Sequence, residues 1–354
     1  MKKMLIIVAA AVAMLCYVTP APVNAADQKT YKFLWSHYTG WEFWQFISDS
    51  GIMKKWCQKY GVNIQIVLIN DYATSINQYS AGDAVGVAVT NMDTLTMPAV
   101  GGVDSEALVI GDYSNGNDGL VLMNGASVKD VKGRNVLIVQ NTVSSYLLSR
   151  ALQMNGMLDR DAKEVNTSDS VIGATFANSG PQGAVVTWNP ILMQIRNLPK
   201  ATMVFDSSKI PGEILDLMIV RKDAPEAVKK ALVGAWYECM SIMVGQDKEK
   251  KDKAIEAMAK FAGGTVAEFV AQLRTTYMYY VPEDGAKFAE SAKLKQSMQE
   301  VNSFCFDHGL YGQNVKSSSF IGIEFPDGSV QGDPKNVKLR FPSKWMRLAA
   351  EGKL

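Results

Sequence analysis

The sequence predicts an α/β protein made of two compact halves that are joined by chain crossings. Strand-like apolar runs alternate with helical patterns along most of the chain. The chain has 354 residues, of which 47% are hydrophobic, enough for two domains with cores of their own. The stretch Gly111–Gly119 is rich in Gly, Asn, Ser and Asp and lies between the apolar runs Ala107–Ile110 and Leu120–Met123. We expect a turn-rich crossing there, and a plain surface loop is the alternative.

The overall charge excludes some classes of partner. Lys and Arg number 36 and Asp and Glu 35, for a net charge of +1, so no global field attracts nucleic acid. His37 and His308 are the two histidines, too few for a histidine-rich metal centre, and we expect no metal and no cofactor. Cys57, Cys239 and Cys305 allow at most one disulfide, and their spacing leaves the pairing open.

The first 25 residues have the pattern of a secretory signal peptide. Lys2 and Lys3 precede an apolar run from Met4 to Tyr17, and small residues end the segment at Ala25. The run is too short to span a membrane comfortably. We therefore expect residues 1–25 to be removed on export.

The first half begins with a strand, because Tyr31–Trp35 alternates in polarity. Later patterns predict a helix over Phe46–Tyr60 that closes at Gly61, a strand over Asn63–Ile69, a helix over Ser75–Ser80 and a strand over Val85–Thr90.

The second half repeats this alternation. The patterns predict a strand over Asn135–Val139, a helix over Tyr146–Asn155 with Thr142 or Ser144 as its cap, a strand end at Val165–Ser168, a helix over Ala174–Asn178 and a strand over Ala184–Thr187.

The rest of the chain returns to the first half. An apolar run reaches Val220, helices are expected from Ala224 to Phe306, and Thr265–Glu268 has the form of a capping box. A final strand over Val337–Phe341 should pack onto the first half.

Aromatic side chains gather just after the first strand. Trp35, Tyr38 and Trp41 lie close together beside small residues, which favours a pocket lining, although a core could hold some of these rings. Trp44 is the one most expected in the core. Trp188, at the exit of another strand, also points towards a cleft.

Polar candidates follow strands or lie at crossings. Asn91 and Asp93 come directly after a strand, where α/β sheets bind ligands, but they would equally serve as helix caps. The other candidates share a place at a crossing or a helix start, and they are Asp118, Ser144, Glu213 and Asp216. Glu213 and Asp216 stand in an apolar run, so they are either ligands at a second crossing or caps for nearby amides.

The chain resembles the substrate-binding proteins of ABC importers, in the branch that takes up nitrate, sulfonates and taurine. The general strings are Val131-Lys132-Gly133, Val143-Ser144-Ser145-Tyr146-Leu147-Leu148 and Thr187-Trp188-Asn189-Pro190. Strings similar to a subgroup of urea-binding proteins associated with urea carboxylase, some of whose relatives are regarded as guanidine enzymes, are Asn70–Tyr72, Thr90–Asp93, Asp112–Gly119, Phe205–Ser208, Pro211–Met218 and Gly234–Glu238. Ser145 departs from the pattern, since relatives often have His there, so a ligand contact at that position would differ.

The resemblance implies a two-lobed type II periplasmic binding protein, each lobe a mixed sheet flanked by helices, joined by two crossings. The first lobe would comprise residues 27–115 plus 220–354, and the second residues 116–219. Lobe closure would trap a small-molecule ligand, and the closed monomer would deliver it in the periplasm to the transmembrane subunits of an ABC permease.

The candidate residues favour a planar nitrogen compound as the ligand. Acids and aromatic rings suit guanidinium best and urea second, whereas two buried acids would repel nitrate or a sulfonate. The positive end of the helix dipole near Ser144 counts against a cation. The alternatives are a binder of nitrate, sulfonate or another small solute and, from a different class, an enzyme like those that make the thiamine pyrimidine on this fold. No nucleophile paired with a base is evident, so we expect no catalysis.

Overall fold

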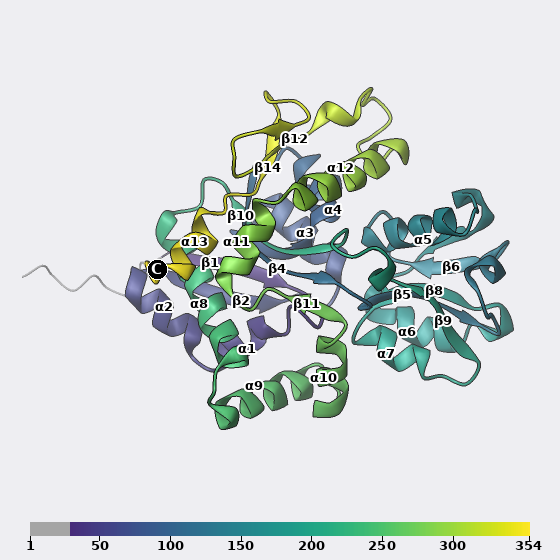
Figure 1. Cartoon of the computed structure of the whole chain (residues 1–354), viewed down its shortest axis with the longest axis horizontal. Coiled ribbons are helices and arrows are strands. Elements are labelled where there is room, and N and C mark those ends of the chain that lie inside the picture. Colours follow the sequence, from purple (N-terminus) through teal and green to yellow (C-terminus); the bar gives the residue numbers. More distant parts are fainter. Residues whose placement is uncertain (1–28) are drawn as a thin grey trace, which may run out of the picture.

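The computed structural model describes residues 29–354, which form two β-sheets flanked by helices (Figure 1). The expected signal peptide, residues 1–25, lies outside the described residues. Within the described range, the strands divide between a nine-stranded and a five-stranded sheet.

The larger sheet has the order β13-β12-β14-β4-β10-β3-β1-β2, with β11 paired to β4. Its strands are β1 (Thr30–Trp35), β2 (Asn63–Leu68), β3 (Gly86–Thr90), β4 (Ser105–Ser114), β10 (Leu215–Arg221), β11 (Thr276–Met278), β12 (Gly322–Glu324), β13 (Val330–Gln331) and β14 (Val337–Arg340). β1 runs parallel to β2 and β3, whereas β10 lies antiparallel between β3 and β4. The expected C-terminal strand is β14, which pairs with β4 of this sheet.

The smaller sheet has the order β7-β6-β8-β5-β9. Its strands are β5 (Asp118–Met123), β6 (Asn135–Ile138), β7 (Lys163–Asn166), β8 (Ala184–Trp188) and β9 (Ala201–Asp206). β6 is parallel to β7 and β8, while β5 is antiparallel to β8 and β9. Both sheets are therefore mixed. Apolar residues of β5 and β8 form a buried cluster with Phe176 and Leu192, which come from two helices packed on this sheet.

Helices cover the faces of both sheets. Around the larger sheet lie α1 (Phe43–Asp49), α2 (Ile52–Tyr60), α3 (Tyr72–Ala81), α4 (Asn91–Thr94), α8 (Glu226–Val244), α9 (Lys248–Phe261), α10 (Val266–Leu273), α11 (Pro282–Ala289), α12 (Ala292–Asp307) and α13 (Lys344–Ala350). The smaller sheet carries α5 (Val143–Met154), α6 (Asp169–Ala177) and α7 (Ile191–Arg196).

Several expected elements have different limits in the structure. The helix expected over Phe46–Tyr60 is two helices, because Gly51 adopts a left-handed conformation with φ of 81° and turns the chain between α1 and α2. The helical region after Ala224 is interrupted by β11. The capping box at Thr265 is present.

Two short crossings connect the sheets. The first is shorter than expected, because β4 continues to Ser114 and only residues 115–117 separate it from β5. Pairing on both sides by β10 and β11 keeps this polar part of β4 extended. The second crossing, residues 207–214, precedes β10. The expected lobe boundary at residues 219 and 220 therefore falls inside β10, which pairs with β3 and β4 along its length.

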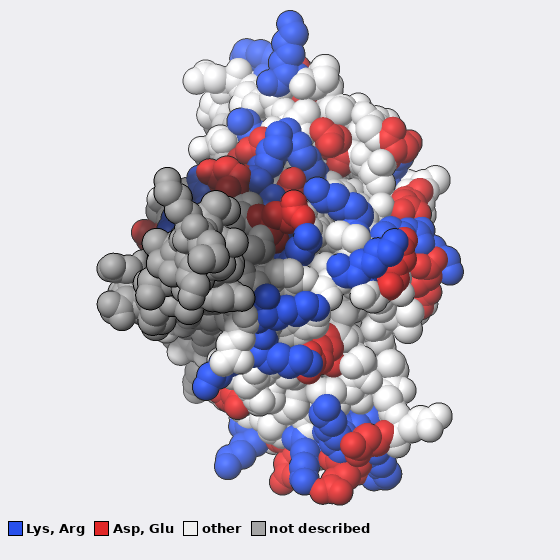
Figure 2. All heavy atoms as spheres, turned by 90° about the vertical axis from the view of Figure 1, so that its left-hand side faces the viewer, with Lys and Arg blue, Asp and Glu red and all other residues white. Residues whose placement is uncertain are grey.

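The surface carries both signs of charge. Figure 2 shows Lys and Arg interspersed with Asp and Glu on one end of the larger half. In the described part of the chain, no helix has the length and apolarity needed to cross a bilayer. Cys57, Cys239 and Cys305, whose pairing the sequence left open, are buried free thiols.

Gly234 is required by the packing of α8 against α2. A Cβ atom at this position would lie 2.4 Å from ring carbons of Trp56, whose indole nitrogen donates a hydrogen bond to Glu238 at 2.7 Å. Because the ring is held, we expect Gly234→Ala to lower the free energy of unfolding by about 1–3 kcal/mol despite the better helix propensity of alanine. Urea denaturation measures this, with exposed Ser241→Ala on the same helix as the control. An unchanged midpoint would show that Trp56 moves freely.

Candidate functional site

A small buried cavity lies between the two sheets. Its lining residues come from both halves and from the second crossing, and they are Tyr38, Trp41, Tyr72, Thr90, Asp118, Val143, Trp188, Ile214 and Asp216. The cavity volume is about 10 Å³, which is roughly the space of a single water molecule, so a larger ligand requires the lining residues to move apart. All nine side chains are buried, so this conformation is closed around the cavity.

One wall of the cavity is set by the register of the larger sheet. On the central strand β10, Asp216 lies opposite Thr90 of β3 on one side and opposite Asp112 of β4 on the other. Two carboxyl groups therefore sit side by side in a fully buried position. The Tyr38 hydroxyl donates a hydrogen bond to Asp112 at 3.1 Å and joins the loop after β1 to this row.

The loop after β1 approaches Asp112 closely because it contains glycine. A Cβ atom on Gly40 would lie 2.4 Å from Asp112 Oδ2 and 2.8 Å from the Tyr38 ring. Any larger side chain would push the carboxylate or the phenol out of place. The small residue here is thus tied to the position of the acid pair.

The opposite wall carries Asp118, the first residue of β5. Its carboxylate accepts a hydrogen bond from the Ser114 hydroxyl at 2.5 Å, and it pairs in register with Trp188 of β8. Ser207 of the second crossing lies 2.6 Å from the same hydroxyl. The Ser207 hydroxyl also accepts a hydrogen bond from the Gly116 amide at 2.8 Å, which links the two crossings next to Asp118.

A fourth buried acid, Asp93, supports the wall from behind. It accepts hydrogen bonds from the Tyr72 hydroxyl at 2.7 Å and from the Thr90 hydroxyl at 2.8 Å, while its Oδ1 atom has no partner. Asp93 is not the cap of α4, because Thr90 fills that position by accepting from the Asp93 amide. Asp93 therefore holds in place the Tyr72 and Thr90 side chains, which line the cavity.

The electrostatics of the site follow from burial without a basic partner. Burial raises the pKa of Asp93 and of Asp112 to about 7 and that of Asp118 to about 6. Burial and the neighbouring Asp112 together raise the pKa of Asp216 well above its usual value. None of the described lining residues is Lys, Arg or His. The cavity therefore lacks positive charge and holds protons readily near neutral pH.

Aromatic rings close the remaining sides. Successive ring centroids are 5.0 Å apart for Tyr38 and Trp41, 5.7 Å for Trp41 and Tyr72, and 5.7 Å for Tyr72 and Trp188. The Trp188 indole nitrogen donates to the His37 carbonyl at 3.0 Å, which connects the smaller sheet to the loop after β1. These rings offer flat faces next to the acids.

Apart from Asp93 and Glu213, three candidates from the sequence lie outside the cavity lining. Trp35 is fully buried in the core, with its ring 5.9 Å from that of Phe261, and does not line the cavity. Asn91 binds backbone, donating to the Glu213 carbonyl at 3.0 Å and accepting from the Leu215 amide at 3.1 Å. Ser144 lies in the first turn of α5 with a buried, unpartnered hydroxyl, beside Val143 in the cavity wall. Thr142, not Ser144, caps α5.

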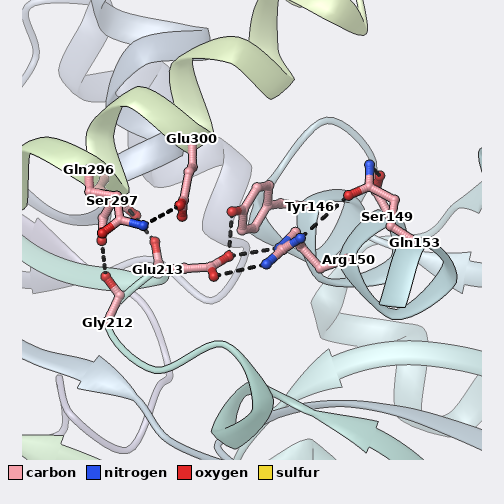
Figure 3. A network of polar contacts seen from close by, with 10 residues as sticks. Tyr146, Ser149, Arg150, Gln153, Gly212, Glu213, Gln296, Ser297 and Glu300 are labelled. Carbon is pink, nitrogen blue, oxygen red and sulfur yellow. Dashed lines mark hydrogen bonds and ion pairs between the residues drawn. The ribbon is translucent and has the colours of Figure 1, made fainter. Parts of the chain in front are cut away.

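Glu213 does not face the cavity. Its carboxylate is bound by the Tyr146 hydroxyl at 2.5 Å and by the Arg150 guanidinium at 2.9 and 3.1 Å (Figure 3). The sequence suggested a ligand or a backbone cap, and neither describes this ion pair. Arg150 lies 63 residues earlier in the chain, a separation at which sequence patterns give no pairing signal.

Sequence reasoning missed five lining or supporting residues: Tyr72, Thr90, Asp112, Val143 and Ile214. Asp112 lay within the expected crossing, but the continuation of β4 and its register with β10 were not evident. Tyr72 lay in an Asn-Asp-Tyr string that was noted for its resemblance alone. Both residues therefore lay in stretches that the sequence had singled out, but nothing in the sequence showed that these stretches meet at the cavity.

No protein-family model matches the sequence, and no relative was found among curated proteins. Solved structures do match. The alkanesulfonate-binding protein SsuA from Xanthomonas axonopodis pv. citri bound to MOPS has a TM-score of 0.65 at 13% identity, covering 81% of this chain and 95% of that one. SsuA from Escherichia coli scores 0.61 at 13%, covering 79% and 88%, and the nitrate-binding protein NrtA from Synechocystis scores 0.56 at 13%, covering 91% and 98%. The chain therefore has the mixed α/β, two-sheet fold of periplasmic binding proteins.

Proposed function

We propose that this protein is the extracytoplasmic solute-binding component of an ABC importer. The fold supports this, as does a buried cavity walled by residues from both halves, which is where such a fold would clamp a solute. In this proposal the lobes comprise residues 27–115 with about 215–354, and 116 to about 214. The exported monomer would act in the periplasm and deliver its ligand to permease subunits.

We propose a small planar cation, guanidinium or a close relative, as the ligand. The observation that carries this is that two carboxyl groups from opposite walls, Asp118 and Asp216, line a cavity that no described basic residue lines. Burying an acid without a partner is costly, and a bound cation offsets that cost. Guanidinium would donate in-plane hydrogen bonds to carboxylates while its faces lie on aromatic rings such as Trp188.

One feature opposes a cationic ligand. The first turn of α5 presents the positive end of a helix dipole, but this effect is worth about 0.3–1 kcal/mol at most sites, less than the attraction of an ionised carboxylate within hydrogen-bonding distance. Urea has the same planar shape as guanidinium and is the second candidate, with less gain because it is neutral. Nitrate or a sulfonate would face the same acids and be repelled, although the solved neighbours include proteins named for those ligands.

Calorimetry on the protein lacking residues 1–25 tests this proposal. Guanidinium chloride at millimolar concentration, with ionic strength matched by NaCl, is compared with urea, nitrate, taurine and MOPS. We expect saturable binding of guanidinium at pH 8, and at a hundredfold excess over Kd a stabilisation of about 2.7 kcal/mol. Binding of nitrate or a sulfonate without guanidinium would contradict the ligand assignment and leave the importer role standing.

A further inference from the structure

The second crossing is fastened to the larger half through its backbone. The Ser297 hydroxyl of α12 donates to the Gly212 carbonyl at 2.6 Å, and Asn91 of α4 holds the next residue, Glu213, through its carbonyl at 3.0 Å. Figure 3 shows Gly212 beside Ser297 on α12. The backbone at Glu213 therefore moves with the larger half.

The Glu213 side chain reaches in the other direction, to α5 of the smaller half. Arg150 binds both carboxylate oxygens, and Tyr146, one turn earlier on α5, binds one of them (Figure 3). This bidentate, charge-assisted geometry is the strong form of such a pair. Glu213 is 6% exposed, so its charge is largely withdrawn from water and depends on these partners.

The pair stands at a seam between α5 and α12. The Tyr146 and Phe304 rings are 5.2 Å apart, and the His308 ring nitrogen lies 3.0 Å from Asp159, but a groove of about 490 Å³ separates much of the two helices. Glu300 of α12 also faces this groove and its charge acts on Arg150. Glu213 and Glu300 therefore both act on Arg150, which is the one basic residue of α5.

We propose that Glu213 is a positioning residue, an interlobe latch that holds α5 in the closed conformation through Arg150 and Tyr146. The latch rests on the proposed function in that the lobes must open and close. Helix α5 carries Arg150 at the seam and, two turns earlier, Val143 in the cavity wall. Because a helix moves as a rigid body, opening the seam at Arg150 withdraws Val143 from the ligand.

The test measures lobe separation without any ligand. Spin labels are placed through Lys163→Cys on β7 and Lys335→Cys before β14, both exposed, while the native thiols are buried. Double electron-electron resonance then compares the parent with Glu213→Gln and with Arg150→Gln. The matched control is Glu290→Gln, which alters a bidentate pair with Arg347 inside the larger half.

We expect both latch variants to raise the open-to-closed ratio about tenfold or more, the factor that corresponds to losing one charge-assisted contact, while the control leaves it unchanged. Calorimetry should show a matching loss of ligand affinity without altered ligand preference. Circular dichroism checks folding, and Arg150 is exposed enough to be replaced if Glu213→Gln does not fold. Distance distributions that stay unchanged in the folded variants would overturn the latch. That result would not depend on which ligand the cavity takes.

Discussion

Asp216→Asn is expected to weaken guanidinium binding by roughly 100-fold or more, because truncating a buried charged partner of a charged ligand costs several kcal/mol. Asp216 lies on the central strand of the larger sheet, between Thr90 and Asp112, and lines the cavity directly. The amide keeps the size of the side chain, so the loss would report charge and not shape. Calorimetry at pH 8 measures the change.

The exposed substitution Asp83→Asn serves as the control, since it removes one negative charge from the same half without touching the cavity. Binding that remains within about twofold of the parent in Asp216→Asn would remove this residue from the site. The same result in Asp118→Asn would leave the acids as structural groups, and the cation proposal would then have no support. Full binding of urea by both variants would favour the neutral ligand.

Guanidinium affinity is expected to rise with pH between about 5 and 8. The cation binds the ionised carboxylates, and burial raises the pKa of Asp118 to about 6 and those of Asp93 and Asp112 to about 7. Below these values the ligand must displace protons that the closed cavity holds. Calorimetry in buffers of different ionisation enthalpy should detect proton release near pH 6. An affinity independent of pH across this range would contradict a cation held by these acids.

The stability of the ligand-free protein should show the opposite trend. These carboxyl groups have raised pKa values in the folded state, so the folded protein binds more protons than the unfolded chain. Their contribution to stability is full below the unfolded value of about 4 and is lost as pH rises through 6 to 7. We therefore expect urea midpoints to fall over that range, and Asp216→Asn to be more stable than the parent at pH 8. Guanidinium at millimolar concentration should restore the urea midpoint of the parent at high pH, and it should not change that of Asp216→Asn.

The sequence was sufficient for many of the elements and for the fold class. Alternating and continuous apolar runs located β1, β2, β3 and β8 to within about two residues, and a terminal glycine marked the end of α2 at Gly61. Local chemistry decides such features, because a strand or a cap depends on neighbouring residues. Gly51 shows the limit, since its left-handed conformation split a helix whose apolar pattern runs on without a break.

Parts of the site were also within reach. The sequence singled out Tyr38, Trp41, Asp118, Trp188 and Asp216, and all five line the cavity. Each stands at a strand end, beside a crossing or in an aromatic cluster, where position along the chain already suggests exposure to a cleft. That these residues bind a ligand stays a prediction.

Only the tertiary structure decided which acids face one another and which do not. Asp112 enters the site because β10 inserts between β3 and β4 and places it opposite Asp216, and that register joins strands about a hundred residues apart in sequence. Glu213 leaves the site because Arg150 on α5 captures its carboxylate, a contact set by how the halves close. A sequence states which residues are charged, whereas burial and partners, which fix the pKa values, arise only when distant segments pack together.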